Sequence, residues 1–465
     1  MNWILACILA YVGSQLLVAF WFSRRNRTEE DYLLAGRSLG PWMTTFAVFA
    51  TWFGAETCIG AAGEAYQAGL SGVIADPFGY AVGIILMGLL FAAALWRRGL
   101  LTLADLFRNR YGPGVERLAA LIMIPSSLMW AAAQVRAFGQ VLSSASELGL
   151  VAAITFAAAV VILYTVVGGM WANAVTDLVQ GVVLVAGILV LGAVFVSMGG
   201  LDRLAALPPQ RFDFLHERSW PDALNTLAVP IFSTLAAQEL AARVLASRST
   251  AVARHATAGA GLLYLAIGVI PVTIGLAAAA FIGADADPEQ VLSLFARDYL
   301  PLPLYILFLG ALVSAILSTL SGALLVAGAL AGHNLIRPLR PGMSEAARLR
   351  TDRASVLFFG VVAWAIALAS DSVYGLVTEA ASLGSSGVLA MMLFALWGGR
   401  FGGNASAYAA LLAGTGVYLW GEHVAGLSAA YLLSVATALA AYAIAALVWP
   451  AAPAASTSPR SRTAS

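Results

Sequence analysis

The chain has 465 residues, of which 61% are hydrophobic and only 11% charged, and its mean hydropathy is +0.86. These values exclude a soluble globular domain and predict an all-α, polytopic membrane protein in the lipid bilayer. The formal net charge of +1 gives no information about partners. For a chain of this composition we expect no nucleic-acid partner, and no obligate protein partner is evident.

Histidines and cysteines form no pattern that would indicate a metal centre or a disulfide. Four histidines are scattered without ligand spacing, and Cys7 and Cys58 lie inside apolar runs. The sequence also lacks an assembled nucleophile, base and metal cluster, so we do not expect an enzyme and expect no cofactor.

Thirteen apolar runs follow one another along the chain, each about long enough to cross a bilayer. The first run lacks a basic leader and a small-residue cleavage site, so it is predicted to be a helix that starts outside rather than a signal peptide. The runs lie at about 3–22, 40–66, 73–96, 116–147, 150–168, 172–198, 221–243, 256–284, 301–332, 354–371, 373–397, 403–422 and 427–449.

Arginines predict the orientation of these helices, because basic residues concentrate in cytoplasmic loops. Most lie in alternate connectors, at 24–37, 97–110, 248–254 and 337–353, whereas the opposite connectors have only Arg203, Arg211, Arg218 and Arg297. We therefore expect the N-terminus outside, the C-terminus in the cytoplasm and a location in the cell's inner (plasma) membrane. Residues 1–450 form one transporter domain, and the proline- and serine-rich tail 451–465 is predicted to be disordered.

Two of the predicted helices contain features that interrupt a helix. The second, in the stretch FATWFGAETCIGAAG (49–63), has three glycines around Glu56, and the seventh has Pro230 followed by polar residues, Ser233 and Gln238 among them. Each begins a block of five helices, about 40–198 and 221–397. Paired broken helices in matching blocks indicate an inverted-repeat transporter with a site at the membrane midplane, although glycine is also common in membrane helices generally.

Charged residues at bilayer depth are costly and tend to face a cavity or a partner. The embedded set is Glu56, Asp76, Arg136, Asp177, Glu239 and Glu379. Arg136 stands out as the only arginine far from either end of its predicted helix. It either forms an internal ion pair, with Glu56 or Glu379, or binds a carboxylate of a solute through its planar guanidinium.

Hydroxyl side chains recur with one-turn spacing in GALVSAILSTLSGALL (310–325), where Ser318 and Thr319 are adjacent. Such hydroxyls usually bond back to the preceding helical turn. Alternatively, they can bind sodium, a hard cation that prefers oxygen ligands, together with carbonyls of an unwound helix.

The segment ILYTVVGGMWANAVTDLVQG (162–181) resembles the signature of the sodium/solute symporter family. The stretches DYLLAGRSLGPW (31–42), LTLADLFRNRYG (101–112) and AILSTLSGALL (315–325) resemble other parts of the same family, so the likeness covers about residues 25–400. The resemblance implies about thirteen helices with a LeuT-type five-plus-five inverted repeat, one extra N-terminal helix and further C-terminal helices.

The resemblance also implies ligand positions. By similarity, sodium is held by Ala50 and Phe53 on the broken helix and by Ala315, Ser318 and Thr319, while Asp177 matches an aspartate linked to a second sodium position or to the ion's exit. Solute positions vary among members; the matching residues here are Glu56, Thr57, Asp76, Arg136, Ser233, Gln238, Thr378 and Glu379. Ser233 and Pro230 replace an aromatic gate and an asparagine of sugar-carrying relatives, which argues against a sugar. Arg136 lies on the helix where sialic-acid carriers have a carboxylate-binding arginine.

The predicted function is therefore sodium-coupled symport of a small polar or anionic organic solute by alternating access, with Na⁺ as the coupling ion. Two alternatives stay open. A proton-coupled carrier of the same fold would use Glu56, Glu379 or Asp177 as its proton site. A symporter-like sensor module is less expected, because the chain ends soon after its thirteenth predicted helix.

Overall fold

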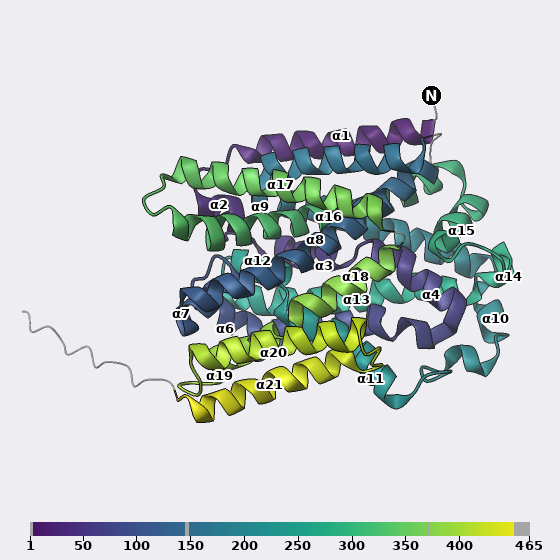
Figure 1. The fold of residues 1–465 in the computed structure, drawn as a ribbon. Coiled ribbons are helices and arrows are strands. Elements are labelled where there is room, and N and C mark those ends of the chain that lie inside the picture. Colours follow the sequence, from purple (N-terminus) through teal and green to yellow (C-terminus); the bar gives the residue numbers. More distant parts are fainter. Residues whose placement is uncertain (1–2, 145–147, 371, 451–465) are drawn as a thin grey trace, which may run out of the picture.

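The computed structural model describes residues 3–144, 148–370 and 372–450, and the predicted disordered tail at 451–465 lies outside the described residues. Within these ranges the chain is a bundle of helices (Figure 1), with one isolated bridge between Leu39 and Ser247 and no other strand pairing. The α-helices are α1 (Trp3–Ser23), α2 (Glu29–Leu34), α3 (Pro41–Trp52), α4 (Ala61–Ala68), α5 (Tyr80–Leu86), α6 (Ala92–Trp96), α7 (Leu103–Tyr111), α8 (Pro113–Ser144), α9 (Leu150–Ser197), α10 (Gly200–Ala205), α11 (Trp220–Ala236), α12 (Gln238–Ala246), α13 (Thr250–Ala277), α14 (Ala279–Ile282), α15 (Val291–Tyr299), α16 (Leu302–Ala329), α17 (Glu345–Ala369), α18 (Val373–Ser385), α19 (Val388–Trp397), α20 (Asn404–His423) and α21 (Ala430–Val448).

Short π-helical and 3₁₀-helical turns join several of these helices. They are η1 (Ala35–Arg37), η2 (Glu56–Gly60), η3 (Gly69–Val73), η4 (Ile74–Gly79), η5 (Met87–Phe91), η6 (Pro209–Phe212), η7 (Pro288–Gln290), η8 (Leu330–Ile336) and η9 (Arg337–Leu339).

Eight helical segments of the described chain are long and apolar enough to cross a membrane, or nine if the bent pair Gly375–Ser385 and Val388–Trp397, which meet at 42°, is one span. This count does not confirm the thirteen spans that the sequence predicts. One reason is α9, which runs through 48 residues where the sequence predicts two helices. A straight helix of that length would measure about 72 Å, more than twice the hydrocarbon thickness. Gly169 interrupts it with a left-handed φ of 62°.

Glycine is required at position 169 for a second reason, which is the close approach of α2. A Cβ atom on Gly169 would lie 2.5 Å from the ring of Tyr32, whose hydroxyl donates to the carbonyl of Thr165. The glycine pair Gly168–Gly169 thus forms the corner at which α2 packs against α9.

The other reason for the lower span count is that two predicted membrane helices are broken into short pieces. The first ends at Trp52, continues through Phe53, whose ψ of 75° is not helical, and resumes as η2 and α4. The second is broken at Ala237, whose ψ is 126°, so that α11 and α12 are separate helices. A break leaves main-chain groups without partners inside the helix, and these groups become available to ions and polar ligands.

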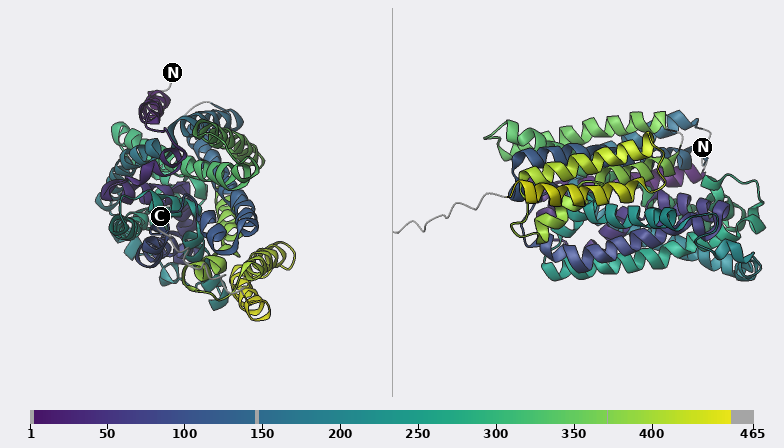
Figure 2. Two further views of the ribbon diagram at one scale, coloured as in Figure 1. Left: turned by 90° about the vertical axis from the view of Figure 1, so that its left-hand side faces the viewer. Right: turned by 60° about the horizontal axis from the view of Figure 1, so that its bottom comes forward.

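Helix α1 and the α20–α21 pair lie at the periphery of the bundle (Figure 2). The membrane-spanning window that contains α16 is 72% buried, whereas that of α1 is only 18% buried. The start of α1 and the end of α21 lie at opposite ends of the bundle (Figure 1). The core therefore surrounds α16, against which the break after α3 is placed.

Candidate functional site

The five residues predicted to hold sodium come from the end of α3 and the middle of α16, which lie side by side. The Thr319 hydroxyl donates to the carbonyl oxygen of Ala50 at 3.2 Å and to that of Ala315 at 3.1 Å. All five residues, Ala50, Phe53, Ala315, Ser318 and Thr319, are at most 1% exposed. Oxygen atoms of two helices thus meet in a dry environment, which is the kind of ligand set that sodium, a hard cation, requires.

Gly54 allows α3 to approach α16 this closely. A Cβ atom at position 54 would lie 2.9 Å from Thr319 Oγ1 and 3.0 Å from Gln134 Oε1. The glycine in the predicted interruption therefore permits the close contact between the chain just after α3 and the hydroxyl-bearing helix α16.

Ser318 points in a different direction from Thr319. Its hydroxyl donates to Asp177 Oδ1 on α9 at 2.8 Å, and Asp177 is completely buried. Asp177 is thus hydrogen-bonded directly to one of the candidate sodium ligands, and its link to a second sodium position or to the ion's exit stays a prediction.

Asp177 has a cationic neighbour that the sequence analysis missed. Arg243 on α12 is 0% exposed, and its Nη2 lies 3.8 Å from Asp177 Oδ2. In the sequence, Arg243 stands at the end of an apolar run and therefore resembles an interfacial residue. The statement that Arg136 is the only deep arginine is corrected, because the helix break at Ala237 lets α12 extend to Ala246 with Arg243 inside the bundle.

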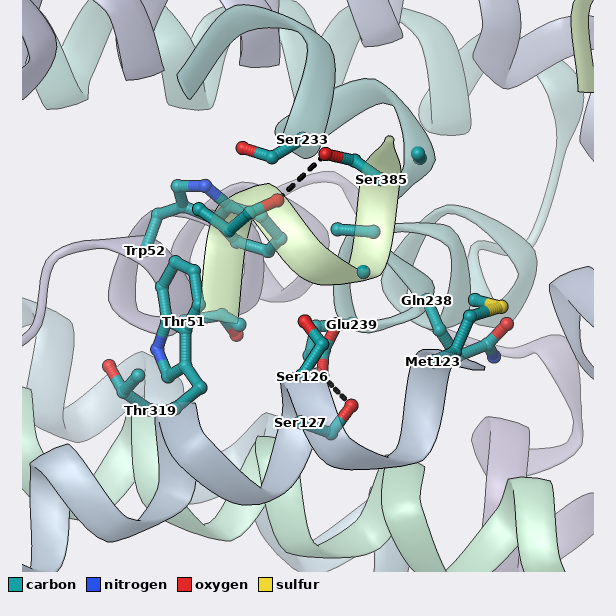
Figure 3. A pocket seen from close by; sticks show the side chains of 15 residues that line it. Thr51, Trp52, Met123, Ser126, Ser127, Ser233, Gln238, Glu239, Thr319 and Ser385 are labelled. Atoms are coloured by element: carbon teal, nitrogen blue, oxygen red, sulfur yellow. Dashed lines mark hydrogen bonds between the residues drawn. The ribbon is translucent and has the colours of Figure 1, made fainter. Parts of the chain in front are cut away.

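A small cavity of about 30 Å³ lies between the two helix breaks (Figure 3), and we call it the Trp52 cavity. It has room for roughly two water molecules. It is lined by Thr51, Trp52, Met123, Ser126, Ser127, Trp130, Ser233, Ala236, Ala237, Gln238, Glu239, Thr319, Ala381, Gly384 and Ser385.

Three of the predicted site residues line the Trp52 cavity, namely Ser233, Gln238 and Thr319. The Gln238 side chain also accepts a hydrogen bond from the main-chain N–H of Leu103. Because Thr319 also belongs to the candidate sodium site, the ion position and the cavity are adjacent.

Two tryptophans and a carboxylate are among the residues that line the Trp52 cavity, and Tyr80 of the neighbouring cavity stands next to them. The rings of Trp52 and Trp130 are 5.8 Å apart, and Tyr80 stands 6.3 Å from Trp130. Glu239 accepts a hydrogen bond of 2.6 Å from Ser127, visible in Figure 3. The sequence analysis counted Glu239 among the embedded charges but did not assign the two tryptophans.

A second cavity of about 400 Å³ lies beyond Tyr80, and we call it the Glu379 cavity. Its volume is within the range of pockets that hold small molecules. Three predicted solute residues line it, Glu56, Thr378 and Glu379, together with Tyr80 and Pro230. Glu379 accepts hydrogen bonds from the Tyr418 hydroxyl at 3.0 Å and lies 3.2 Å from His423 Nε2.

Thr57 and Asp76 line neither cavity, because they bond to each other. The Thr57 hydroxyl is 2.8 Å from Asp76 Oδ2, and the Tyr264 hydroxyl is 2.9 Å from Asp76 Oδ1 and 2.7 Å from the Thr57 hydroxyl. This closed cluster joins η2, η4 and α13. Arg136, on α8, also belongs to the lining of neither cavity.

A family model described as "Sodium:solute symporter family" matches residues 32–414 of the chain. The chain belongs to the sodium:solute symporter family. The resemblance seen in the sequence is thereby confirmed, and this symporter is a multi-pass membrane transporter rather than an enzyme.

Among curated relatives, the high-affinity choline transporter 1 of Caenorhabditis elegans is 28% identical to this symporter over 414 residues, which cover 80% of this chain and 70% of the relative. The human high affinity choline transporter 1 is also 28% identical, over 412 residues that cover 80% and 69% of the two chains. An uncharacterized symporter of Bacillus subtilis, YwcA, is 25% identical over 447 residues and covers 92% and 85%.

Solved structures show that this symporter has the LeuT-type fold. A Na⁺-coupled sialic acid symporter in a substrate-bound outward-open state superposes with a TM-score of 0.84 at 18% identity, covering 96% of this chain and 98% of the other. MhsT in complex with L-phenylalanine superposes with a TM-score of 0.61 at 13% identity, covering 88% and 98%. The limits of the two repeats, about 40–198 and 221–397, stay a prediction.

Proposed function

We propose that this symporter uses the sodium gradient to import a small organic cation by alternating access. The observation that carries the proposal is the grouping of aromatic rings and carboxylates around the two helix breaks. Trp52, Trp130 and Glu239 line the Trp52 cavity, and Tyr80 and Glu56 line the adjoining Glu379 cavity. Aromatic faces attract cations, and cages of such rings are used to recognise quaternary ammonium groups.

The relatives support a cationic solute, because choline, which appears in the names of two of them, is a quaternary ammonium ion. The anionic solute expected from the sequence is the second candidate. It depends on Arg136, and this arginine is absent from the lining of both cavities. One arginine, Arg218, does line the Glu379 cavity, but it is paired with Asp222 at 3.4 Å, and the same cavity is lined by three acids, Glu56, Glu379 and Glu422. A cation therefore fits the side chains of the cavities better than an anion.

Thr319 belongs to both the candidate sodium site and the Trp52 cavity, and this shared residue could couple the binding of ion and solute. Its hydroxyl contacts the Ala50 carbonyl in the candidate sodium site, and the same residue lines the Trp52 cavity. If sodium and solute each favour the same arrangement of these helices, each raises the affinity for the other by an equal factor. The Trp52 cavity, at about 30 Å³, is too small for an organic solute, so admission requires the helices around the breaks to move apart.

We further propose that the N-terminus faces outward and the C-terminus faces the cytoplasm, in the plasma membrane. A cavity of about 750 Å³ at one end of the bundle is lined by Arg108, Arg117, Arg337, Arg340 and Arg348. Figure 1 places α7 and the α16–α17 connection at the same end as the end of α21. The positive-inside rule assigns this end to the cytoplasm.

The experiment is a thermal-shift and binding panel on the purified symporter, with choline, betaine, amino acids, carboxylates and sugars, each in sodium and in potassium buffer. We expect stabilisation by choline or a similar ammonium compound in sodium only. If carboxylates stabilise the protein instead, and the Arg136→Gln variant loses this stabilisation, the solute is an anion rather than a cation.

A second experiment tests the candidate sodium site. The double variant Ser318→Ala with Thr319→Ala removes both hydroxyls of that site. We expect it to insert normally and to lose sodium-driven uptake in proteoliposomes. Undiminished uptake would contradict the sodium site, and uptake driven by a pH gradient without sodium would favour the proton-coupled alternative.

A further inference from the structure

The cavity of about 750 Å³ at the arginine-rich end of the bundle, which we call the arginine cavity, collects basic side chains from distant segments of the chain. Arg108 and Arg117 belong to α7 and α8, Arg337 and Arg340 to η9 and the residue after it, and Arg348 to α17. The volume is within the range of pockets that hold small ligands. The positive-inside rule accounts for the number of arginines in these loops, but it does not require them to line one hollow.

The lining of the arginine cavity contains little negative charge. Among the described residues that line it, Asp105 is the one acid. Its Oδ1 lies 3.1 Å from His333 Nε2 and accepts a hydrogen bond of 3.1 Å from Asn334. Its Oδ2 accepts hydrogen bonds from the main-chain N–H groups of Leu101 and Thr102, at 2.9 and 3.0 Å. One carboxylate, with both oxygens already engaged, therefore stands against five guanidinium groups.

The five arginines differ in the partners that they have. Arg108, Arg337 and Arg348 form ion pairs of 3.7, 2.9 and 2.5 Å, each with an acid that does not line the cavity. Arg348 Nε is nevertheless buried without a hydrogen bond in the part of the chain that the structure describes. Arg117 and Arg340 are exposed and form no ion pair with any described residue. The cavity thus has guanidinium groups available for an anion.

The start of α8 adds positive potential, and apolar side chains lie beside it. Pro113, the first residue of this 32-residue helix, lines the cavity. The N-terminus of a helix carries a partial positive charge that favours anions. Leu100, Pro338, Pro341 and Met343 also line the cavity. The lining therefore offers charge for a phosphate group and apolar surface for the group esterified to it.

We propose that the arginine cavity binds a phosphate ester, which is either the headgroup of an anionic lipid or a soluble phosphate compound. Guanidinium groups match phosphate oxygens with pairs of parallel hydrogen bonds, and Arg117 and Arg340 have no anion of the described chain to bind instead. The bound phosphate joins α7 and α8 to the connection between α16 and α17. The arginine cavity shares no lining residue with the Trp52 cavity or the Glu379 cavity, so this site is separate from the proposed solute path.

The test is isothermal titration of the purified full-length protein in non-ionic detergent, at constant ionic strength in chloride, with three related probes. Dihexanoyl phosphatidic acid has a phosphate ester and acyl chains, glycerol 3-phosphate has the phosphate ester alone, and dihexanoylglycerol has the chains alone. We expect saturable binding of phosphatidic acid with a Kd below about 1 mM and no binding of dihexanoylglycerol.

Two double variants locate the binding. Arg117→Gln with Arg340→Gln should weaken it at least about 10-fold, because hydrogen bonds to charged groups are worth about 1.5–3 kcal/mol each. Arg27→Gln with Arg350→Gln removes the same charge from two exposed arginines outside the lining and should bind as the wild type does. Size exclusion should show both variants monodisperse.

The two sources of the phosphate give different results. Binding of both phosphatidic acid and glycerol 3-phosphate, weakened in the Arg117 and Arg340 variant, means that the phosphate ester suffices. Binding of phosphatidic acid alone, weakened in the same variant, assigns the site to a lipid headgroup. No saturable binding by the wild type, or equal losses in the two double variants, would overturn the proposal. Choline and sodium binding are measured separately, so a failure of the proposed solute would leave this site standing.

Discussion

Each buried acid near the helix breaks has its own type of partner, and the partner indicates its role. Asp76 bonds to the hydroxyls of Thr57 and Tyr264, and Asp177 faces Arg243. Glu239 accepts a hydrogen from Ser127. Glu56 lines the larger Glu379 cavity and is 5% exposed. Glu56 is therefore, with Glu379 and Glu422, one of the carboxylates that a cation in this cavity would meet.

We expect Glu56→Gln to weaken choline binding by about 10- to 100-fold, since charge-assisted contacts are worth about 1.5–3 kcal/mol. Sodium binding without solute should change little. Isothermal titration in sodium buffer measures the affinity, and Glu217→Gln, at an acid whose side chain is 87% exposed, is the matched control. Equal affinity in the Glu56 variant would exclude this carboxylate from the solute path.

Trp130 is placed to form a cation–π contact, because its ring lies between those of Trp52 and Tyr80. Such contacts contribute about 2 kcal/mol when desolvated, so Trp130→Leu should weaken choline binding by roughly 30-fold while Trp130→Phe weakens it less. The neutral isostere 3,3-dimethylbutanol should be affected less than choline in the same competition assay. Trp420→Leu, at a tryptophan that is 54% exposed, serves as control. Identical losses for choline and its neutral isostere would indicate a purely steric role.

At the scale of elements, the break between α3 and η2 depends on its contact with α16. The main chain at Phe53 leaves helical geometry, and Gly54 places backbone directly against Thr319 and Gln134. The main-chain N–H of Ala55 also donates to Gln134 Oε1 at 3.2 Å, which stabilises the chain just after the break. The geometry of the candidate sodium ligands thus depends on three helices, α3, α8 and α16.

We expect Gly54→Ala to lower sodium affinity at least 10-fold, because the added methyl group would lie 2.9 Å from Thr319 Oγ1 and displace that hydroxyl. Gly310→Ala on α16 is the matched control, since a Cβ atom at Gly310 meets nothing within 4 Å. The readout is the sodium concentration that gives half-maximal thermal stabilisation. An unchanged concentration for Gly54→Ala would mean that the ion does not bind at this break.

At the scale of the whole molecule, a buried charge cluster joins three segments at the arginine-rich end. His333, on η8, lies 2.6 Å from Glu29 of α2 and 3.1 Å from Asp105 of α7. Burial would raise the pKa of Glu29, but the hydrogen bond and charge of His333, with Arg337 and Arg348, hold it below the usual range. At Asp105, too, burial alone would raise the pKa. Hydrogen bonds and charge from His333, and hydrogen bonds from the main-chain N–H groups of Thr102 and Leu101, lower the pKa of Asp105 below its usual value.

A carboxylate whose pKa is lower in the folded state contributes stability above its unfolded pKa, and this contribution is lost as the pH falls towards the folded value. We therefore expect the melting temperature in detergent to change little between pH 7 and about pH 5 on account of these two carboxylates and to fall as the pH is lowered below about 5, towards their lowered pKa values. Asp105→Asn should remove about 1–3 kcal/mol at pH 7 and make the acid-side decline shallower. The control variant Asp202→Asn, at an exposed acid, should change neither the stability at pH 7 nor the decline of the melting temperature at low pH. A parallel decline in the Asp105 variant would contradict this assignment.

Much of the architecture follows from the sequence alone. The apolar runs predict a helical membrane protein, the glycines around Glu56 and the proline at 230 indicate where helices are interrupted, and the segment at 162–181 indicates the family. These features are local, because the length of an apolar run and the conformational preferences of glycine and proline do not depend on distant residues.

Only the tertiary structure decides which buried polar groups meet. Ser318 and Thr319 are adjacent in sequence, yet successive helical residues point about 100° apart, so one reaches Asp177 and the other Ala50. Arg243 enters the interior because α12 begins only after the break at Ala237. Thr57 donates directly to Asp76, and α13 adds the Tyr264 hydroxyl to both residues. A sequence pattern reports that a side chain is buried, whereas its partner depends on how separate helices cross and where they break.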